Sequence, residues 1–294
     1  MFTAFHKYGA HRPDDVPFVA CRRTVRGVAV LLLALLVVPG VGCTNPSIAN
    51  SADGPHSIAS PLVRQTGQQP TQWAVIPMPK PSVVPFGISP GPGKDIWVTE
   101  NAGNHVDWID PATDRFTRYP VPTQKAVLGA IALGPDGNLW FAERAVSKMG
   151  RITPTGVVTE FPLPGGSDPI DIVTGSDGNL WFTDFPHKAV AKMTTAGVVT
   201  EYALPSGSSP GTLTLGPDHN MWFDETGPRV GKVTPAGSIT EYSTGNSSPT
   251  SGIAVGADGA LWFGEVNLPR LGRVTTAGVV TSFYIRGEFS RGSS

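Results

Sequence analysis

Five tryptophans recur at nearly constant spacing through the last two thirds of this 294-residue sequence. Consecutive members lie 43, 41, 41 and 40 residues apart, and they are Trp97, Trp140, Trp181, Trp222 and Trp262. Each stands in a similar phrase, such as Asn138-Leu-Trp-Phe-Ala-Glu143. A repeat of this length is typical of architectures in which each unit buries its apolar face against the next unit.

Each unit contains the signals of four short strands. An Asp-Gly pair such as Asp136-Gly137 precedes the tryptophan phrase, and it suits a tight hairpin whose two central residues take positive φ. A second turn follows the phrase, at Gly156 in the second unit. The sequence has 35 glycines and 29 prolines, which favours short strands and turns over a helical bundle. We therefore predict an all-β protein, a β-propeller of four-stranded blades with about 41 residues each.

The expected propeller covers residues 71–285, and five complete blades are visible within it. Residues 286–294 are expected to be a tail or the start of a truncated blade. An incomplete larger ring would leave sheet edges and an apolar blade face uncovered. This arrangement predicts a homodimer or poor solubility.

The N-terminal residues are expected to direct export. Residues 27–42 carry no charge and follow three arginines, but they are shorter than the roughly 20 apolar residues of a membrane-spanning helix. We interpret residues 1–43 as a signal peptide. The phrase Gly40-Val-Gly-Cys43 resembles the lipobox of bacterial lipoproteins, which implies lipidation of Cys43 and a membrane anchor. The alternative is a plain signal peptide and a secreted protein.

Residues 44–70 are rich in polar residues, glycine and proline and are expected to form a flexible tether. The formal net charge of −1 argues against nucleic-acid binding, which needs a basic surface. The two cysteines, Cys21 and Cys43, cannot supply a disulfide framework or a cysteine metal site. The expected partner is a small-molecule or protein ligand at the propeller mouth, where loops gather on a rigid scaffold.

The repeated phrases resemble those of the virginiamycin B lyase (streptogramin lyase) family. The resemblance covers about residues 72–285 and rests on phrases such as Gly134-Pro-Asp-Gly-Asn-Leu-Trp-Phe141 and Val157-Val-Thr-Glu-Phe-Pro-Leu-Pro164. It implies a seven-bladed propeller that opens the ring of streptogramin B antibiotics by elimination at the ester, with Mg²⁺ as cofactor. It also implies a general-base histidine on an innermost strand, in a Pro-His-x-Ile phrase.

This sequence has no histidine at the equivalent positions of the innermost strands. Those positions hold Phe86, Gly129, Ile170, Gly211 and Ser251. None of these side chains accepts a proton near neutral pH. We therefore expect a binding module that lacks the family's catalytic histidine. The alternatives are a carbon–oxygen lyase that opens streptogramin B or a related cyclic ester with another base, and a sensor or scaffold similar to NHL-repeat propellers.

An acidic residue ends the tryptophan phrase in every unit, and the five are Glu100, Glu143, Asp184, Glu225 and Glu265. They are expected to form a carboxylate ring around one mouth of the channel, which suits a hard cation. Glu143, Glu225 and Glu265 are its candidate binding residues. The alternative is a cross-strand ion pair inside each blade, with the basic residues Arg151, Lys192, Lys232 and Arg273.

Two blades depart from this pattern. The first has Asp107 where the others have a base, so Glu100 and Asp107 form a candidate metal site unless a more distant base compensates. In the third, Asp171, Asp184 and His187 form a candidate catalytic or metal-binding group. The alternative there is a solvated loop histidine beside two capping aspartates.

Overall fold

A computed structural model of the chain describes residues 19–20, 74–75 and 84–285. The chain divides into two units, Met1–Met78 and Pro79–Ser294. In the first unit, β1 (Val19–Ala20) pairs antiparallel with β2 (Ala74–Val75). Apart from Val19–Ala20, the expected signal peptide with Cys43 lies outside the described residues, as do the expected tether and the expected tail. In the described part of the chain, no helix has the length and apolar character needed to cross a membrane.

The second unit contains five four-stranded antiparallel sheets, which are the blades. Blade one consists of β3 (Pro85–Pro90), β4 (Ile96–Glu100), β5 (His105–Asp110) and β6 (Arg115–Pro120). Blade two consists of β7 (Leu128–Leu133), β8 (Leu139–Glu143), β9 (Lys148–Ile152) and β10 (Val158–Pro162), with the short 3₁₀ helix η1 (Arg144–Val146) after β8.

The remaining three blades follow the same order. Blade three consists of β11 (Pro169–Thr174), β12 (Leu180–Asp184), β13 (Ala189–Met193) and β14 (Val199–Ala203). Blade four consists of β15 (Pro210–Leu215), β16 (Met221–Glu225), β17 (Arg229–Val233) and β18 (Ile239–Ser243). Blade five consists of β19 (Thr250–Val255), β20 (Leu261–Glu265), β21 (Arg270–Val274) and β22 (Val280–Tyr284).

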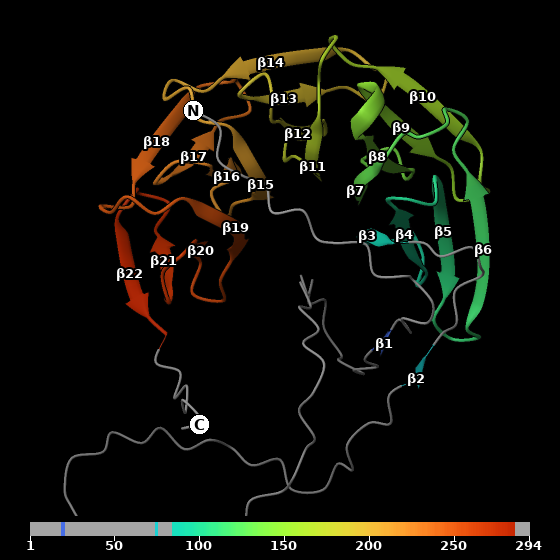
Figure 1. Cartoon of the computed structure of the whole chain (residues 1–294), viewed down its shortest axis with the longest axis horizontal. Coiled ribbons are helices and arrows are strands. Elements are labelled where there is room, and N and C mark those ends of the chain that lie inside the picture. The colour runs from blue at the N-terminus through green and yellow to red at the C-terminus, as the bar shows by residue number, and fades with distance from the viewer. Residues whose placement is uncertain (1–18, 21–73, 76–83, 286–294) are drawn as a thin grey trace, which may run out of the picture. The chain divides into compact units, whose positions relative to one another are not determined.

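The blades of this unit follow one another around an open arc (Figure 1). Their first strands lie innermost and pack in chain order, β3 against β7, β7 against β11, β11 against β15 and β15 against β19. Their fourth strands lie at the outer edge (Figure 1). Among the described strands, β19 makes no comparable packing with β3. The predicted propeller of four-stranded blades is thus confirmed.

The tryptophans hold neighbouring blades together. Trp140 is fully buried, packs against Leu180 and Phe182 of the next blade, and stacks on Phe161 of its own outer strand. Its indole nitrogen donates a hydrogen bond of 3.0 Å to Asp136 in the preceding turn. Such rings combine a large buried apolar area with one satisfied polar group. Trp97, Trp181 and Trp222 are buried in the same way.

The turn before each tryptophan differs from the predicted two-residue hairpin. In blade two only Gly137 has positive φ, at +76°, whereas Asp136 does not. The amide of Gly137 donates to the carbonyl of Gly134, so a three-residue loop ends in a left-handed glycine. Asp136 is needed as an acceptor, because its carboxylate also binds Asn138. Asp136 therefore does not adopt a positive φ, and its role in the turn is to accept hydrogen bonds, including that of the Trp140 indole.

Candidate functional site

The five acidic residues that end the second strands all lie at the same end of their blades. Glu143 is opposite Leu128 and Asp184 is opposite Pro169, each at the start of an innermost strand. All five side chains are buried, with exposed fractions of 0–4%. They contact groups of their own blade and the loop that precedes it. The predicted ring of carboxylates around a channel mouth is therefore wrong, because these groups are enclosed within the blades.

The alternative prediction, an ion pair with the base of the next strand, is also wrong. Three of those bases pair instead with aspartates in the turn at the opposite end of the blade. The pairs are Lys192 with Asp177 (3.8 Å), Lys232 with Asp218 (4.0 Å) and Arg273 with Asp258 (2.7 Å). Arg151 lies over the rings of Trp140 and Phe161. Lys192 and Lys232 likewise lie over Trp181 and Trp222, so these two cations and Arg151 each cover a tryptophan ring.

In blades two to four, the buried acid shares its face of the sheet with an acid of the outermost strand. The alternation of side chains along each strand places Glu143, Lys148 and Glu160 on one face of blade two. The ammonium of Lys148 lies 2.7 Å from Glu160. Neither carboxylate oxygen of Glu143 has a hydrogen-bond partner. Burial, helped by the Glu160 charge, raises the pKa of Glu143 to about 8, so this group is protonated at neutral pH.

The other two predicted binding residues are engaged by the loops that precede their blades. Glu225 accepts a hydrogen bond of 3.0 Å from the Ser206 hydroxyl, and burial raises its pKa to about 7. Glu265 accepts hydrogen bonds from Asn246 (3.1 Å) and from the Ser282 hydroxyl (2.5 Å). Neither carboxylate faces open solvent.

In blade one, a base from the outermost strand compensates the neighbouring acidic residues Glu100 and Asp107. The guanidinium of Arg118 contacts Glu100 and lies 3.2 Å from Asp107. Burial, reinforced by the adjacent Asp107, raises the pKa of Glu100 to about 9 despite this arginine. Arg118 is therefore the more distant base that compensates the two acidic residues. No cation is needed to compensate Glu100 and Asp107.

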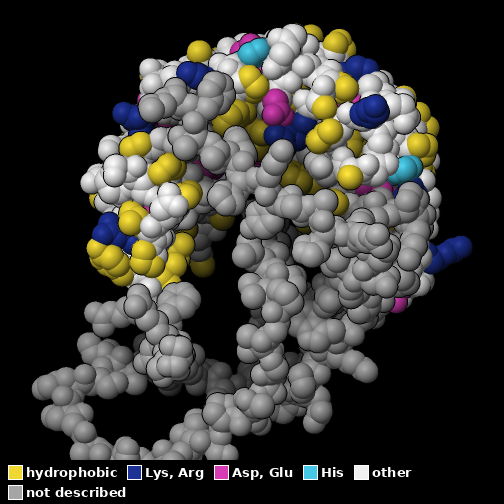
Figure 2. All heavy atoms as spheres, viewed as in Figure 1, with side chains coloured by type: hydrophobic (Ala, Val, Ile, Leu, Met, Phe, Trp, Pro, Cys, Tyr) yellow, Lys and Arg dark blue, Asp and Glu magenta, His cyan; other side chains and the backbone are white. Residues whose placement is uncertain are grey.

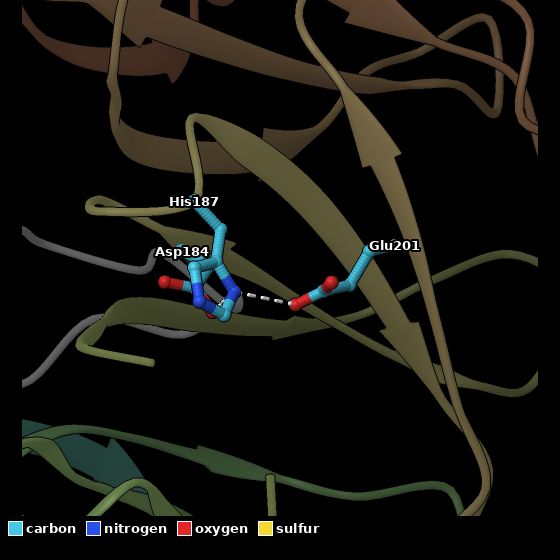
Figure 3. Close-up of side chains that lie close together, drawn as sticks. All are labelled: Asp184, His187 and Glu201. Atoms are coloured by element: carbon cyan, nitrogen blue, oxygen red, sulfur yellow. Dashed lines mark hydrogen bonds and ion pairs between the residues drawn. The ribbon is translucent and has the colours of Figure 1, made fainter. Parts of the chain in front are cut away.

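Blade three brings together Asp184, His187 and Glu201 (Figure 3). The Nδ1 atom of His187 lies 3.0 Å from a Glu201 oxygen and 3.2 Å from Asp184 Oδ2. Its pKa is raised, chiefly by the hydrogen bond with Glu201 and also by the two carboxylate charges. Glu201 was absent from the predicted site. Counting alternate residues along β14 from the repeated Val-Thr-Glu phrase would have placed it on the face of Asp184.

Asp171, predicted to join this group, lies apart from it. Its two oxygens accept amide hydrogen bonds from Ile172 (2.9 Å) and from Leu213 on the innermost strand of blade four (3.0 Å). Burial raises its pKa to about 6, although these two hydrogen bonds oppose the shift. Asp171 therefore clamps blade three to blade four.

The innermost strands at the centre of the described arc carry few ionisable side chains. Asp171 is the only ionisable residue on the five innermost strands β3, β7, β11, β15 and β19. Phe86 and Ser251 are exposed there, and Ile170 is half-buried. These strands hold no histidine.

Comparison with known proteins gives one consistent group. The model of the virginiamycin B lyase family matches residues 71–293. Selenomethionine-substituted virginiamycin B lyase from Staphylococcus aureus is 36% identical over 69% of this chain and 71% of that chain, with a TM-score of 0.66. A catalytically inactive histidine-to-alanine variant of the Staphylococcus aureus enzyme, solved with quinupristin, is 35% identical over 70% and 71%, also with a TM-score of 0.66.

A further solved relative is a streptogramin B lyase. It is 33% identical over 72% of each chain, with a TM-score of 0.67. No curated protein sequence matches significantly.

Proposed function

Because the chain belongs to the virginiamycin B lyase family, we propose that it binds a cyclic depsipeptide of the streptogramin B class without opening its ring. The observation that carries the proposal is the absence of histidine from the five innermost strands of the described residues. A shared fold does not transfer an activity when the groups that perform it are missing.

The chemistry of ring opening requires a base. Elimination at an ester removes a proton from carbon while the carbon–oxygen bond breaks, and a side chain within reach must accept that proton. In the Staphylococcus aureus lyase, replacing one histidine by alanine gives a catalytically inactive protein. On the described innermost strands of this chain, the five positions compared with the family's Pro-His-x-Ile phrase carry phenylalanine, glycine, isoleucine or serine. The buried carboxylates lie inside the blades and do not substitute for that histidine.

Lyase activity with Asp171 as the base is the second candidate. It is favoured by one observation, the Asp171 pKa of about 6, which suits a general base near neutral pH. It is disfavoured by the two amide hydrogen bonds that already occupy the carboxylate oxygens. We therefore assign Asp171 a structural role.

The described innermost strands do not fit the Mg²⁺ that the family resemblance implies. Mg²⁺ is usually held by one or two carboxylates together with water and substrate oxygens. Asp171 is the only carboxylate on these strands, and its oxygens are occupied. No step of the proposed function involves magnesium.

We also propose that the chain is exported and acts outside the cytoplasm. The arginines and the uncharged stretch of residues 27–42 favour a signal peptide, and Cys43 is the proposed lipid anchor. Streptogramin-class ligands would meet such a protein at the cell surface or in the periplasm.

The test uses the full chain and quinupristin as the probe. Isothermal calorimetry measures binding, and liquid chromatography with mass detection then examines the recovered ligand. Binding with unchanged quinupristin is the expected result. A product of unchanged mass but new retention would show elimination and overturn the proposal. Asp171→Asn would then report whether Asp171 is the base. Failure of the folded chain to bind quinupristin would overturn the assigned ligand class.

A further inference from the structure

The Asp184–His187–Glu201 cluster contains no lysine or arginine, unlike the clusters of blades one and two. Blade one also has a histidine beside its buried acid, with His105 3.5 Å from Glu100, but Arg118 contacts that acid as well. Blade two places Lys148 beside its paired acids, and blade one places Arg118 there. In blade three the first residue of the third strand is Ala189, so no lysine or arginine starts that strand. His187 from the preceding turn takes the vacant place (Figure 3). An imidazole nitrogen can bind a metal ion, whereas a protonated lysine or arginine cannot.

Asp184 supplies a second, independent indication of a ligand. Its side chain is fully buried, yet its Oδ2 atom has no hydrogen-bond partner. A buried carboxylate oxygen without a partner is costly, and such groups are normally paired or bound to a metal. This oxygen points toward His187, whose Nδ1 lies 3.2 Å away. In blade three, therefore, a buried carboxylate oxygen without a hydrogen bond lies within ion-pair distance of a potential metal ligand.

The arrangement of donor atoms fits a small tetrahedral site. The three donor atoms, one from each residue, all lie within 4.8 Å of one another. Zinc binds histidine nitrogen and carboxylate oxygen at about 2.0–2.2 Å, which places neighbouring ligand atoms of a tetrahedral site about 3.3–3.5 Å apart. The two nitrogen–oxygen separations of 3.0 and 3.2 Å are close to that value.

The surroundings of His187 are also suitable. The backbone of Gly165 hydrogen-bonds the imidazole, and Nε2 faces the adjoining Gly166. Metal-binding histidines commonly use their second ring nitrogen in this way, since the contact fixes the ring orientation. The side chains of His187 and Glu201 are 28% and 30% exposed. Solvent can therefore reach the position and supply a fourth ligand.

From these contacts we propose that Asp184, His187 and Glu201 bind one divalent transition-metal ion of the Zn²⁺ class. One nitrogen with two carboxylate oxygens and an open position matches the ligands that Zn²⁺ accepts. The imidazole makes the site less suited to Mg²⁺ or Ca²⁺, which prefer oxygen ligands throughout. The three residues come from β12, the turn after it and β14, and none of them belongs to an innermost strand. The proposal does not depend on the ligand-binding function.

The test is a Zn²⁺ titration of the metal-stripped full chain by calorimetry, with Co²⁺ absorption as a spectroscopic second readout. The wild-type chain is expected to bind one more equivalent of Zn²⁺ than His187→Lys. That variant supplies the positive charge that blade two obtains from Lys148. Glu201→Gln is expected to weaken binding at least about tenfold, and Co²⁺ should give the intense visible bands of a tetrahedral site.

The matched control is Glu160→Gln in blade two, at the strand position of Glu201 but in a cluster without histidine. It should leave Zn²⁺ binding unchanged. Equal binding by wild type and His187→Lys would overturn the proposal, as would no binding by the wild type. If His187→Lys fails to fold, the Co²⁺ spectra of wild type and Glu201→Gln decide. Identical spectra would contradict the site.

Discussion

Glu143 shows how a single buried residue contributes to the pH dependence of stability. Its carboxyl group has no hydrogen-bond partner and carries a pKa of about 8, against an ordinary value of 4.5. Between these values the folded chain holds a proton that the unfolded chain has released. Linkage then requires the free energy of unfolding to fall as the pH rises from about 4.5 to 8.

We predict that Glu143→Gln flattens this decline. One fully linked proton changes the free energy of unfolding by about 1.4 kcal/mol per pH unit. The free energy of unfolding of the variant, relative to that of the wild type, should therefore be higher at pH 7.5 than at pH 5. Urea unfolding at several pH values measures the difference. Parallel stability curves for wild type and variant would contradict the assigned protonation. Glu160→Gln should flatten the decline less, because it removes only the contribution of the Glu160 charge to the raised pKa of Glu143, whereas burial makes the larger contribution.

The aspartate beneath each tryptophan is the second residue-scale determinant. Asp177 accepts the indole hydrogen bond of Trp181 at 3.0 Å, and Trp181 is 1% exposed. Asp258 accepts the equivalent bond from Trp262, which is only partly buried. Removing the acceptor therefore leaves an unsatisfied buried donor in blade three but one that can reach water in blade five.

Asp177→Ala should accordingly destabilise the chain by about 1–3 kcal/mol, the cost of a buried unsatisfied donor. Asp258→Ala should cost less for the indole bond. Each variant also loses an ion pair, that of Asp177 with Lys192 (3.8 Å) or that of Asp258 with Arg273 (2.7 Å). Chemical denaturation followed by tryptophan fluorescence compares the two. An equal or larger loss in Asp258→Ala would mean that the ion pair, and not burial of the indole, controls stability.

At the scale of elements, the sequence predicted the blades well because their signals are local. Period-2 alternation, turn glycines and the tryptophan phrase each lie within a few residues of the strand that they specify. The candidate site was harder to predict because its partners come from non-adjacent strands. Arg118 contacts Glu100 from β6, the outermost strand of blade one, and Glu201 contacts His187 from β14, the outermost strand of blade three. Spacing along the sequence suggested the base of the next strand as the partner of each acid. In blade three that base is Lys192, which lies over the ring of Trp181 instead.

The clamp between blades three and four gives a prediction at this scale. Asp171→Ala removes the acceptor of the Leu213 amide, so hydrogen exchange of that amide should accelerate. The amide of Ile253, which donates to Thr212 across the next interface, should keep its protection. Exchange measured by NMR reports both sites in one sample. Unchanged protection of Leu213 would show that the Asp171 contact does not hold the blades together.

At the scale of the whole propeller unit, the two end blades present apolar faces that the inner blades bury. Hydrophobic side chains gather over blade five (Figure 2), and Leu271, Phe283 and Tyr284 are 40%, 44% and 67% exposed. On blade one, Phe86 and Ile88 are 51% and 58% exposed. Because blade-to-blade packing recurs four times within the chain, a second copy offers a matching surface, and we propose self-association through blade five.

Sedimentation velocity of the 294-residue chain is expected to show association that increases with concentration. Replacing Leu271 and Phe283 together by glutamate should shift the population toward monomer. Val198→Glu, at an exposed hairpin valine of blade three, is the matched control and should have no effect. A chain that is monomeric at every concentration, or association equally sensitive to Val198→Glu, would contradict this interface.

The central claim is that this family member binds without turnover, and ring opening tests it most directly. Quinupristin would be incubated with the full chain and, in parallel, with the Staphylococcus aureus lyase. Samples taken over time would be separated by liquid chromatography and analysed by mass spectrometry. We expect the isomeric, ring-opened product only with the Staphylococcus aureus enzyme. The same product from this chain, lost when the protein is denatured, would contradict it.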